Sequence, residues 1–226
     1  MWENIIEDSI TNIPSTYGEN ELAFLAIQSK IELQLRDKIA WYIEKKLKAG
    51  QYIEQNINAR QYCVRREYNV PGKGKGREKC DLAILDIDNN MKPVCLIEFK
   101  AHSAATFEKG YIKMCNHDIA KMRRIASSTE PKPEIYYIFF QTEHQGTLPV
   151  NNGLIAYYNI IKKALNQKLG ITHIHNQWDP YYKNGKNYSN GIITKLQIPA
   201  GRYYGLRIVI HAMMLKVDFE SITCLK

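Results

Sequence analysis

The fold is decided by two short apolar segments, Lys79-Cys80-Asp81-Leu82-Ala83-Ile84-Leu85 and Val94-Cys95-Leu96-Ile97-Glu98-Phe99-Lys100. Their apolar and β-branched residues predict two strands, at 79–87 and 93–100. Between them lies Asn89-Asn90, a pair of residues typical of a tight turn. We therefore expect the two strands to form a hairpin within one sheet.

Three charged side chains interrupt these apolar strands. Residues two apart on a strand point to the same face, so Glu98 and Lys100 are expected to project together. A loop of two or four residues centred on Asn89-Asn90 would place Asp81 opposite Glu98, whereas an odd-numbered loop would shift the pairing by one residue. Directly opposed side chains lie about 5 Å apart at Cβ, so these two carboxylates could share one cation.

Such a grouping is costly unless something offsets its charge. Two neighbouring carboxylates repel, which raises the pKa of one of them. Mg²⁺ would relieve the repulsion, because it prefers oxygen ligands and leaves positions for water and phosphate oxygens. Lys100 could then orient an attacking water and offset charge on the phosphate. The alternative is an exposed sheet edge, but the apolar run before Glu98 indicates a buried strand, where unpaired charges are expensive.

Hydrophobic periodicity predicts the other elements. Helices are expected at 19–48, 104–127 and 152–169, and further strands at 62–70 and 134–142. Residues 176–205 are rich in Asn, Tyr, Gly and Lys and are expected to be loops, whereas 207–217 is expected to be a strand rather than a buried helix. The alternation of helices and strands predicts an α/β protein.

The motif and the order of the elements over about residues 19–142 resemble the PD-(D/E)XK nuclease superfamily, which has the restriction-endonuclease-like fold. Asp81 matches the acidic residue of its second core strand and Glu98-Phe99-Lys100 its third, while Cys80 stands in place of the proline. The resemblance implies a mixed four-stranded sheet flanked by helices (αβββαβ), with extra C-terminal elements. Residues 1–170 would form the nuclease core, and 171–226 an extension packed on it for substrate binding or dimerisation.

The resemblance also implies a catalytic and metal-binding Glu on the first core helix, beside Asp81 and Glu98. Glu32 fits best, because it shares a helix stripe with Leu35 and Ile39 and would face the sheet. A surface position paired with Arg36, four residues on, is the alternative. The other acidic candidates are Glu21, Glu44 and Glu67.

Basic side chains provide candidates for substrate binding. The net charge of +8 favours a polyanionic partner. The candidates are Lys73, Lys75 and Arg77 in a glycine-rich segment, His102 after the motif, and Lys121 on the second helix. A flexible turn, a plain loop and a solvated helix face are the respective alternatives. The glycine-rich segment lacks the spacing of a phosphate-binding P-loop, and Cys115/His117 and His173/His175 lack partners at zinc spacing.

The expected function is that of a Mg²⁺-dependent DNA endonuclease, similar to prokaryotic restriction or defence nucleases, with Mn²⁺ able to substitute. RNA is an alternative substrate, and a homodimer would be expected for cleavage of a duplex. The rival interpretation is a degenerate member that binds nucleic acid or a partner without cutting. Five scattered cysteines and the lack of a secretory or membrane-spanning stretch lead us to expect a cytoplasmic protein without a membrane partner.

Overall fold

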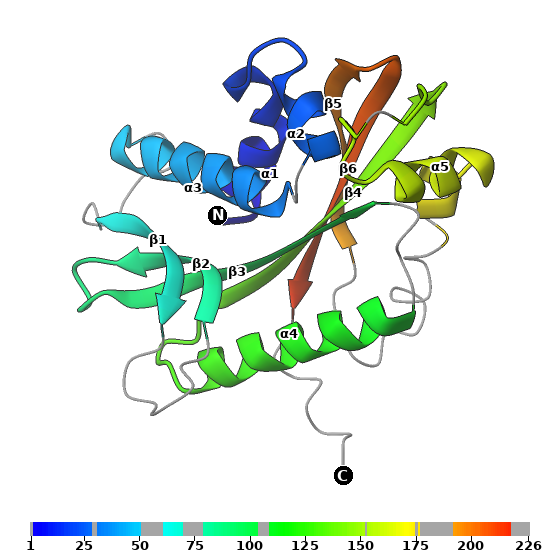
Figure 1. The fold of residues 1–226 in the computed structure, drawn as a ribbon. Helices are drawn as coiled ribbons and strands as arrows, with labels where there is room; N and C mark the ends of the chain where they lie inside the picture. Colours follow the sequence, from blue (N-terminus) through cyan, green and yellow to red (C-terminus); the bar gives the residue numbers. More distant parts are fainter. Residues whose placement is uncertain are drawn as a thin grey trace.

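The computed structural model describes residues 2–28, 31–50, 61–69, 79–103, 109–151, 153–174, 176 and 192–217. They form an α/β fold in which helices flank both faces of a mixed six-stranded sheet (Figure 1). The strands are β1 (Tyr62–Asn69), β2 (Lys79–Asp86), β3 (Lys92–Ser103), β4 (Glu134–Gly146), β5 (Ile192–Tyr203) and β6 (Leu206–Val217), in the order β1-β2-β3-β4-β6-β5. The prediction of a mixed sheet between helices is confirmed. The predicted number of four strands is wrong, because β5 and β6 extend the sheet beyond β4.

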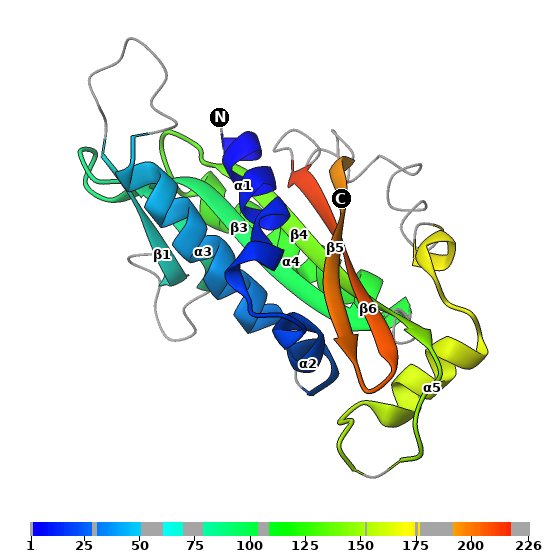
Figure 2. The same cartoon turned by 90° about the horizontal axis from the view of Figure 1, so that it is seen from above.

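Helices cover the two faces of the sheet unequally. They are α1 (Trp2–Thr11), the short 3₁₀ helix η1 (Ile13–Thr16), α2 (Glu21–Gln28), α3 (Glu32–Lys48), α4 (Lys109–Ser127) and α5 (Tyr158–Asn166). The first three α-helices lie over one face, and α4 lies along the opposite face (Figures 1 and 2). Each face has its own apolar core: α3 buries Leu35 and Ile39 on the first, and α4 buries Met122 and Ile125 on the second.

Strand β3 is buried from both sides, as its near-continuous apolar sequence predicts. Ile97 and Phe99 pack in the core under α1 to α3, whereas Leu96 packs in the core under α4. Because side chains alternate along a strand, Glu98 and Lys100 lie on the face of Leu96, toward α4. Strand β3 pairs antiparallel with β2 and parallel with β4, so the motif lies inside the sheet rather than on its edge.

The pairing of β2 with β3 brings Asp81 opposite Glu98. Leu82 pairs with Ile97 and Ala83 with Leu96. Asp81 and Glu98 are the next residues beyond the Leu82–Ile97 pair, and the N–H of Asp81 donates a hydrogen bond to the Glu98 carboxylate. The connecting loop holds five residues, 87–91, between the paired Asp86 and Lys92, which is the odd-numbered alternative rather than a loop of two or four residues. A register shift between Ile84 and Leu85 takes up the odd residue. The odd loop length therefore does not shift the pairing beside the motif, and the expected register is confirmed at the neighbouring pair of Leu82 and Ile97.

The C-terminal hairpin corrects the expectation of loops at 176–205 for residues 192–205, whereas 177–191 lie outside the described residues. Its strand β6 confirms the strand expected at 207–217, but β5 lies within the supposed loop region. Ile198 and Ala200 of β5 are buried while Lys195 and Gln197 are exposed, as in an edge strand that is covered on one face. The two strands are joined at Tyr204-Gly205, where both residues have positive φ angles (49° and 75°).

The helices also differ from the expectations. Helix α1 was not predicted, and the single helix expected at 19–48 is divided into α2 and α3. The helices expected at 104–127 and 152–169 are described over shorter spans, as α4 and α5. None of the helices in the described part of the chain is long and apolar enough to cross a membrane.

Candidate active site

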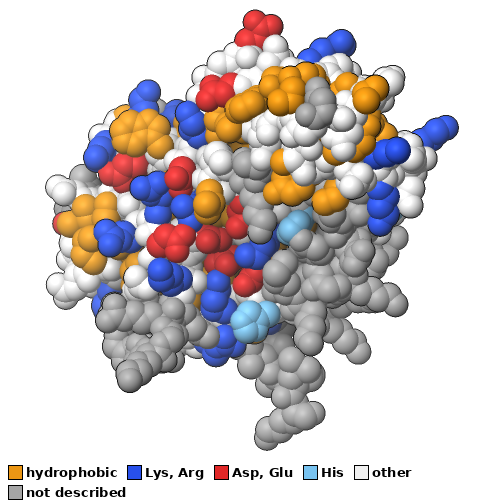
Figure 3. All heavy atoms as spheres, in the orientation of Figure 1, with side chains coloured by type: hydrophobic (Ala, Val, Ile, Leu, Met, Phe, Trp, Pro, Cys, Tyr) orange, Lys and Arg blue, Asp and Glu red, His pale blue; other side chains and the backbone are white. Residues whose placement is uncertain are grey.

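Asp81 and Glu98 contact each other's strands. The Asp81 carboxylate accepts a hydrogen bond from the backbone N–H of Phe99 at 2.9 Å, and the N–H of Asp81 donates to Glu98 Oε2 at 3.4 Å. Glu98 is only 2% exposed. Both carboxylates therefore occupy the junction of β2 and β3. Figure 3 shows acidic and basic side chains gathered near the middle of this face of the molecule, between the positions of α3 and α4 in Figure 1.

Two lysines and a further carboxylate complete the cluster. Lys121 Nζ lies 2.6 Å from Glu98 Oε1, and Lys100 Nζ lies 3.9 Å from the same oxygen. Asp118 joins the two lysines, with its oxygens 3.3 Å from Lys100 Nζ and 3.8 Å from Lys121 Nζ. Glu98, Lys121, Asp118 and Lys100 thus form a ring of alternating charges between β3 and α4.

The surroundings of the carboxylates shift their proton affinity. Burial raises the pKa of Glu98 to about 7, and the neighbouring charge of Asp81 adds to the shift, while Lys121 opposes it. Burial also raises the pKa of Asp81, against the hydrogen bond from Phe99 and the charge of Lys100. A bound cation would favour the ionised form of both carboxylates.

Lys100 stays charged although it is largely buried. Burial alone would lower its pKa, but the carboxylates of Asp118, Glu32, Glu98 and Asp81 outweigh that effect and raise it. An ammonium group held in this way can stabilise negative charge or orient a water, but it is a poor proton acceptor. Lys100 is therefore suited to an electrostatic role rather than to that of a general base.

Glu32 reaches β3 from the first turn of α3. Its Oε2 accepts a hydrogen bond from the N–H of Ala101 at 2.9 Å, directly after Lys100. The expectation that Glu32 faces the sheet is confirmed, and its carboxylate is among the groups that raise the pKa of Lys100. Its role as a metal ligand stays a prediction.

The other acidic candidates serve local contacts. Glu21 accepts a hydrogen bond from the N–H of Gly18, and Glu44 accepts one from the N–H of Val64, each at 2.8 Å. Glu67 forms an ion pair with Arg36. Each of the three glutamates therefore has a partner within the protein, which accounts for it without a bound ligand.

The predicted substrate-binding residues have different outcomes. Lys73, Lys75 and Arg77 lie outside the described residues. His102 lies on β3 two residues beyond Lys100, on the same face, with its ring centroid 6.1 Å from that of Phe139. Lys121 was expected to face a substrate, but in this structure it contacts Glu98.

Asp118 is a member of the cluster for which no role was predicted from the sequence. It is only 8% exposed, and its buried Oδ2 accepts no hydrogen bond from the described residues, so its contact with Lys100 is purely an ion pair. A pattern could have revealed it, because Asp118 precedes the buried Met122 and Ile125 by four and seven residues. A carboxylate on the buried stripe of an amphipathic helix requires a partner.

The donor set at the site fits a hard cation. No group of three His, Cys, Asp or Glu side chains that could hold a metal occurs among the described residues. Asp81 and Glu98 nevertheless offer two neighbouring carboxylates, and Mg²⁺ is usually held by one or two carboxylates together with water and substrate phosphates. The residues present therefore fit this ion better than zinc, which takes several nitrogen or sulfur ligands.

Comparison with known proteins does not identify the chain. No family model, curated protein or solved structure matches it. The resemblance drawn from the motif stays a prediction, and the function is inferred from the geometry of this site.

Proposed function

We propose that this protein is a metal-dependent nuclease that hydrolyses phosphodiester bonds of DNA at the cluster of Asp81, Glu98 and Lys100. The observation that carries the proposal is a pair of carboxylates at one junction of two strands, the buried Glu98 and the half-buried Asp81, with the pKa of Glu98 raised to about 7. Such a pair is unfavourable for folding, and strongly perturbed groups are concentrated at functional sites.

Mg²⁺ is the proposed cofactor, with Mn²⁺ able to replace it. Asp81 and Glu98 would hold the ion, with Glu32 as a further candidate ligand. When bound, the ion would supply Lewis acidity toward the phosphate and lower the pKa of a bound water. The described residues include no third ligand grouped with the pair, so substrate oxygens and water would complete the coordination.

The lysines and Asp118 have separate roles in this proposal. Lys100 would orient the attacking water and stabilise the charge that develops on the phosphate. Asp118, 3.3 Å from Lys100 Nζ, would hold the ammonium group in position. Lys121 would neutralise Glu98 before the site is loaded, and then transfer its contact to Asp118 and the substrate.

A second candidate is a module of similar architecture that binds nucleic acid or a partner without cutting. One observation favours it: Lys121 already compensates the charge of Glu98 at a distance of 2.6 Å, without a cation. In this case the charged ring would serve mainly to join α4 to the sheet. The two candidates differ in whether Asp81 is required for cleavage.

The test is cleavage of supercoiled plasmid and of labelled duplex, single-stranded and RNA oligonucleotides in the presence of Mg²⁺. We expect Asp81→Asn, Glu98→Gln and Lys100→Met each to lower the rate by about 100-fold or more, as for loss of a main electrostatic contribution. Lys216→Met is the control, because it removes an ion pair of similar length, 2.7 Å to Glu134, outside the cluster.

The outcomes separate the candidates. Full activity in Asp81→Asn would contradict the assigned roles. Tight binding of nucleic acid without cleavage by the unaltered protein would favour the binding module. The ranking of the four substrates would show which nucleic acid is preferred, and the oligomeric state during duplex cleavage would test the expected homodimer.

A further inference from the structure

A groove on the outer side of α3 is separate from the acidic cluster. It has a volume of about 420 Å³, which is within the range of about 300–1,000 Å³ typical of small-ligand sites. One wall is formed by a stripe of α3 and the residue that follows its end: Lys38, Trp41, Tyr42, Lys45, Lys46 and Ala49. Ser15 and Thr16 of η1 form the other wall. We call this feature the outer groove.

The spacing along α3 explains how the groove forms. Its lining residues recur at three- and four-residue intervals, so they share one face of the helix. Lys38 joins the two walls: its Nζ donates to the backbone oxygen of Thr16 at 2.9 Å and lies 4.6 Å from the centroid of the Tyr17 ring. This contact holds η1 beside α3, so the two walls of the groove are linked to each other.

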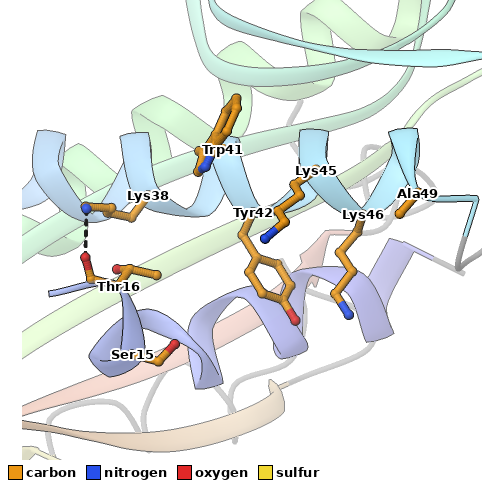
Figure 4. A pocket seen from close by; sticks show the side chains of 8 residues that line it. All are labelled: Ser15, Thr16, Lys38, Trp41, Tyr42, Lys45, Lys46 and Ala49. Carbon is orange, nitrogen blue, oxygen red and sulfur yellow. Dashed lines mark hydrogen bonds between the residues drawn. The ribbon is translucent and has the colours of Figure 1, made fainter.

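The chemistry of the lining combines aromatic surface with positive charge. Trp41 is 65% exposed, an unusual position for the largest apolar side chain. Lys46 Nζ lies 5.3 Å from the centroid of the Tyr42 ring. Figure 4 shows Tyr42, Lys45 and Lys46 extending on the side of α3 where Ser15 and Thr16 lie, with Trp41 projecting away at the rim. Among the described residues that line the groove, none is acidic.

An explanation based on helix stability accounts for only part of this arrangement. Lysines in the last turn of a helix interact favourably with its dipole, which explains Lys45, Lys46 and Lys48 equally. That effect gives no reason for an exposed Trp41 between the lysines. An exposed indole ring at the rim, with ammonium groups along the groove, matches a ligand that has both flat apolar bases and phosphates.

We propose that the outer groove binds single-stranded nucleic acid, with a base stacked on Trp41 and phosphates contacted by Lys45 and Lys46. Aromatic stacking and a positively charged groove are the two features that such binding requires. An acidic peptide would use the lysines but would gain little from the indole ring. The inference takes its class of partner from the proposed function, but it uses none of the residues of the acidic cluster.

The test is fluorescence anisotropy of a labelled 20-nucleotide oligothymidylate, titrated with the full-length protein in EDTA at several salt concentrations. Trp41→Ala is expected to weaken binding about fivefold or more, because one stacking contact is lost. Lys45→Ala is expected to weaken binding. It should also reduce the slope of log affinity against log salt concentration by roughly one, because one phosphate contact is lost. Lys48→Ala is the matched control, because Lys48 lies in the same helical turn but pairs with Glu44 and does not line the groove.

The same titration distinguishes this inference from the proposed function. Asp81→Asn should retain the groove-dependent binding even if it loses cleavage, and groove-dependent binding without any nuclease activity would overturn only the proposed function. Equal effects of Lys45→Ala and Lys48→Ala, or unchanged binding in Trp41→Ala, would overturn the inference. Competition by polyglutamate as effective as that by unlabelled oligothymidylate would also overturn it, in favour of an acidic peptide. Unfolding curves of the variants confirm that any loss arises from the folded protein.

Discussion

Glu98 is the residue for which stable folding and the proposed function make the most opposed demands, because a carboxylate that is to bind a cation is buried. It is nearly inaccessible, lies beside Asp81, and is compensated by Lys121. Burial raises its pKa to about 7, so the folded protein holds a proton there that the unfolded chain releases near pH 4.5. The native state binds more protons than the unfolded state between these values, and its stability therefore falls as the pH rises through that interval.

The first prediction concerns this dependence on pH. Relative to Glu98→Gln, the unaltered protein should lose free energy of unfolding between about pH 4.5 and pH 7, by on the order of 3 kcal/mol for the shift from 4.5 to about 7. Urea unfolding at pH 4.5, 6 and 8 measures the difference directly. Parallel pH profiles for the two proteins would mean that Glu98 titrates normally in the folded state.

At the scale of single elements, α4 and the hairpin of β2 and β3 assemble the cluster together. The hairpin supplies Asp81, Glu98 and Lys100, and α4 adds Asp118 and Lys121 three residues apart on one face. Lys121 lies where it compensates Glu98 most directly, so a divalent cation bound to Glu98 must compete with it.

The second prediction follows from this competition. Lys121→Met should bind Mn²⁺ more tightly, by roughly tenfold, because a like charge close to the ion is removed. The same variant should cleave DNA more slowly, since Lys121 is proposed to contact the substrate. Electron paramagnetic resonance of free Mn²⁺ at pH 8.5, together with cleavage rates, measures both effects. Lys121→Arg is the conservative control, and an unchanged Mn²⁺ affinity in Lys121→Met would argue against the competition.

Local patterns in the sequence predicted much of this site and part of the fold. Alternation along β3 placed Glu98 and Lys100 on one face, and the helical stripe turned Glu32 toward the sheet. An odd-numbered loop was expected to shift the pairing, but the register shift between Ile84 and Leu85 compensates for the five-residue loop, and local sequence gives no sign of that irregularity. The contacts of Asp118 and Lys121 with β3 depend on how α4 crosses the sheet, which periodicity alone does not determine.

For the whole molecule, the main feature missed from the sequence is the extent of the sheet. Strand β6 pairs antiparallel with β4: Ile135 pairs with Val217 at one end, and Gly146 pairs with Leu206 at the other. Strand β5 forms the far edge of the sheet. As an edge strand, β5 alternates buried and exposed residues and contains Pro199 and Gly201, so its composition resembles that of a loop. Long-range pairing stabilises such a strand, and local sequence gives little indication of it.

The third prediction tests the expected boundary at residue 170. A fragment of residues 1–170 would lack β5 and β6, leaving the edge of β4 unpaired and removing Ile208, Ile210 and Met214 from the core. We expect this fragment to show no cooperative thermal unfolding by circular dichroism, whereas the full chain unfolds in one transition. A fragment with a cooperative transition and native-like far-ultraviolet signal would demonstrate an independent core domain.

The central claim is that Asp81 and Glu98 hold one divalent cation between β2 and β3. Anomalous diffraction from crystals soaked in Mn²⁺ tests it most directly, with Asp81→Asn crystals as the control. The account predicts a single strong peak in contact with both carboxylates, which is lost in Asp81→Asn, and displacement of Lys121 from Glu98. Absence of a peak at this junction, with Lys121 still bound to Glu98 at saturating Mn²⁺, would contradict the claim.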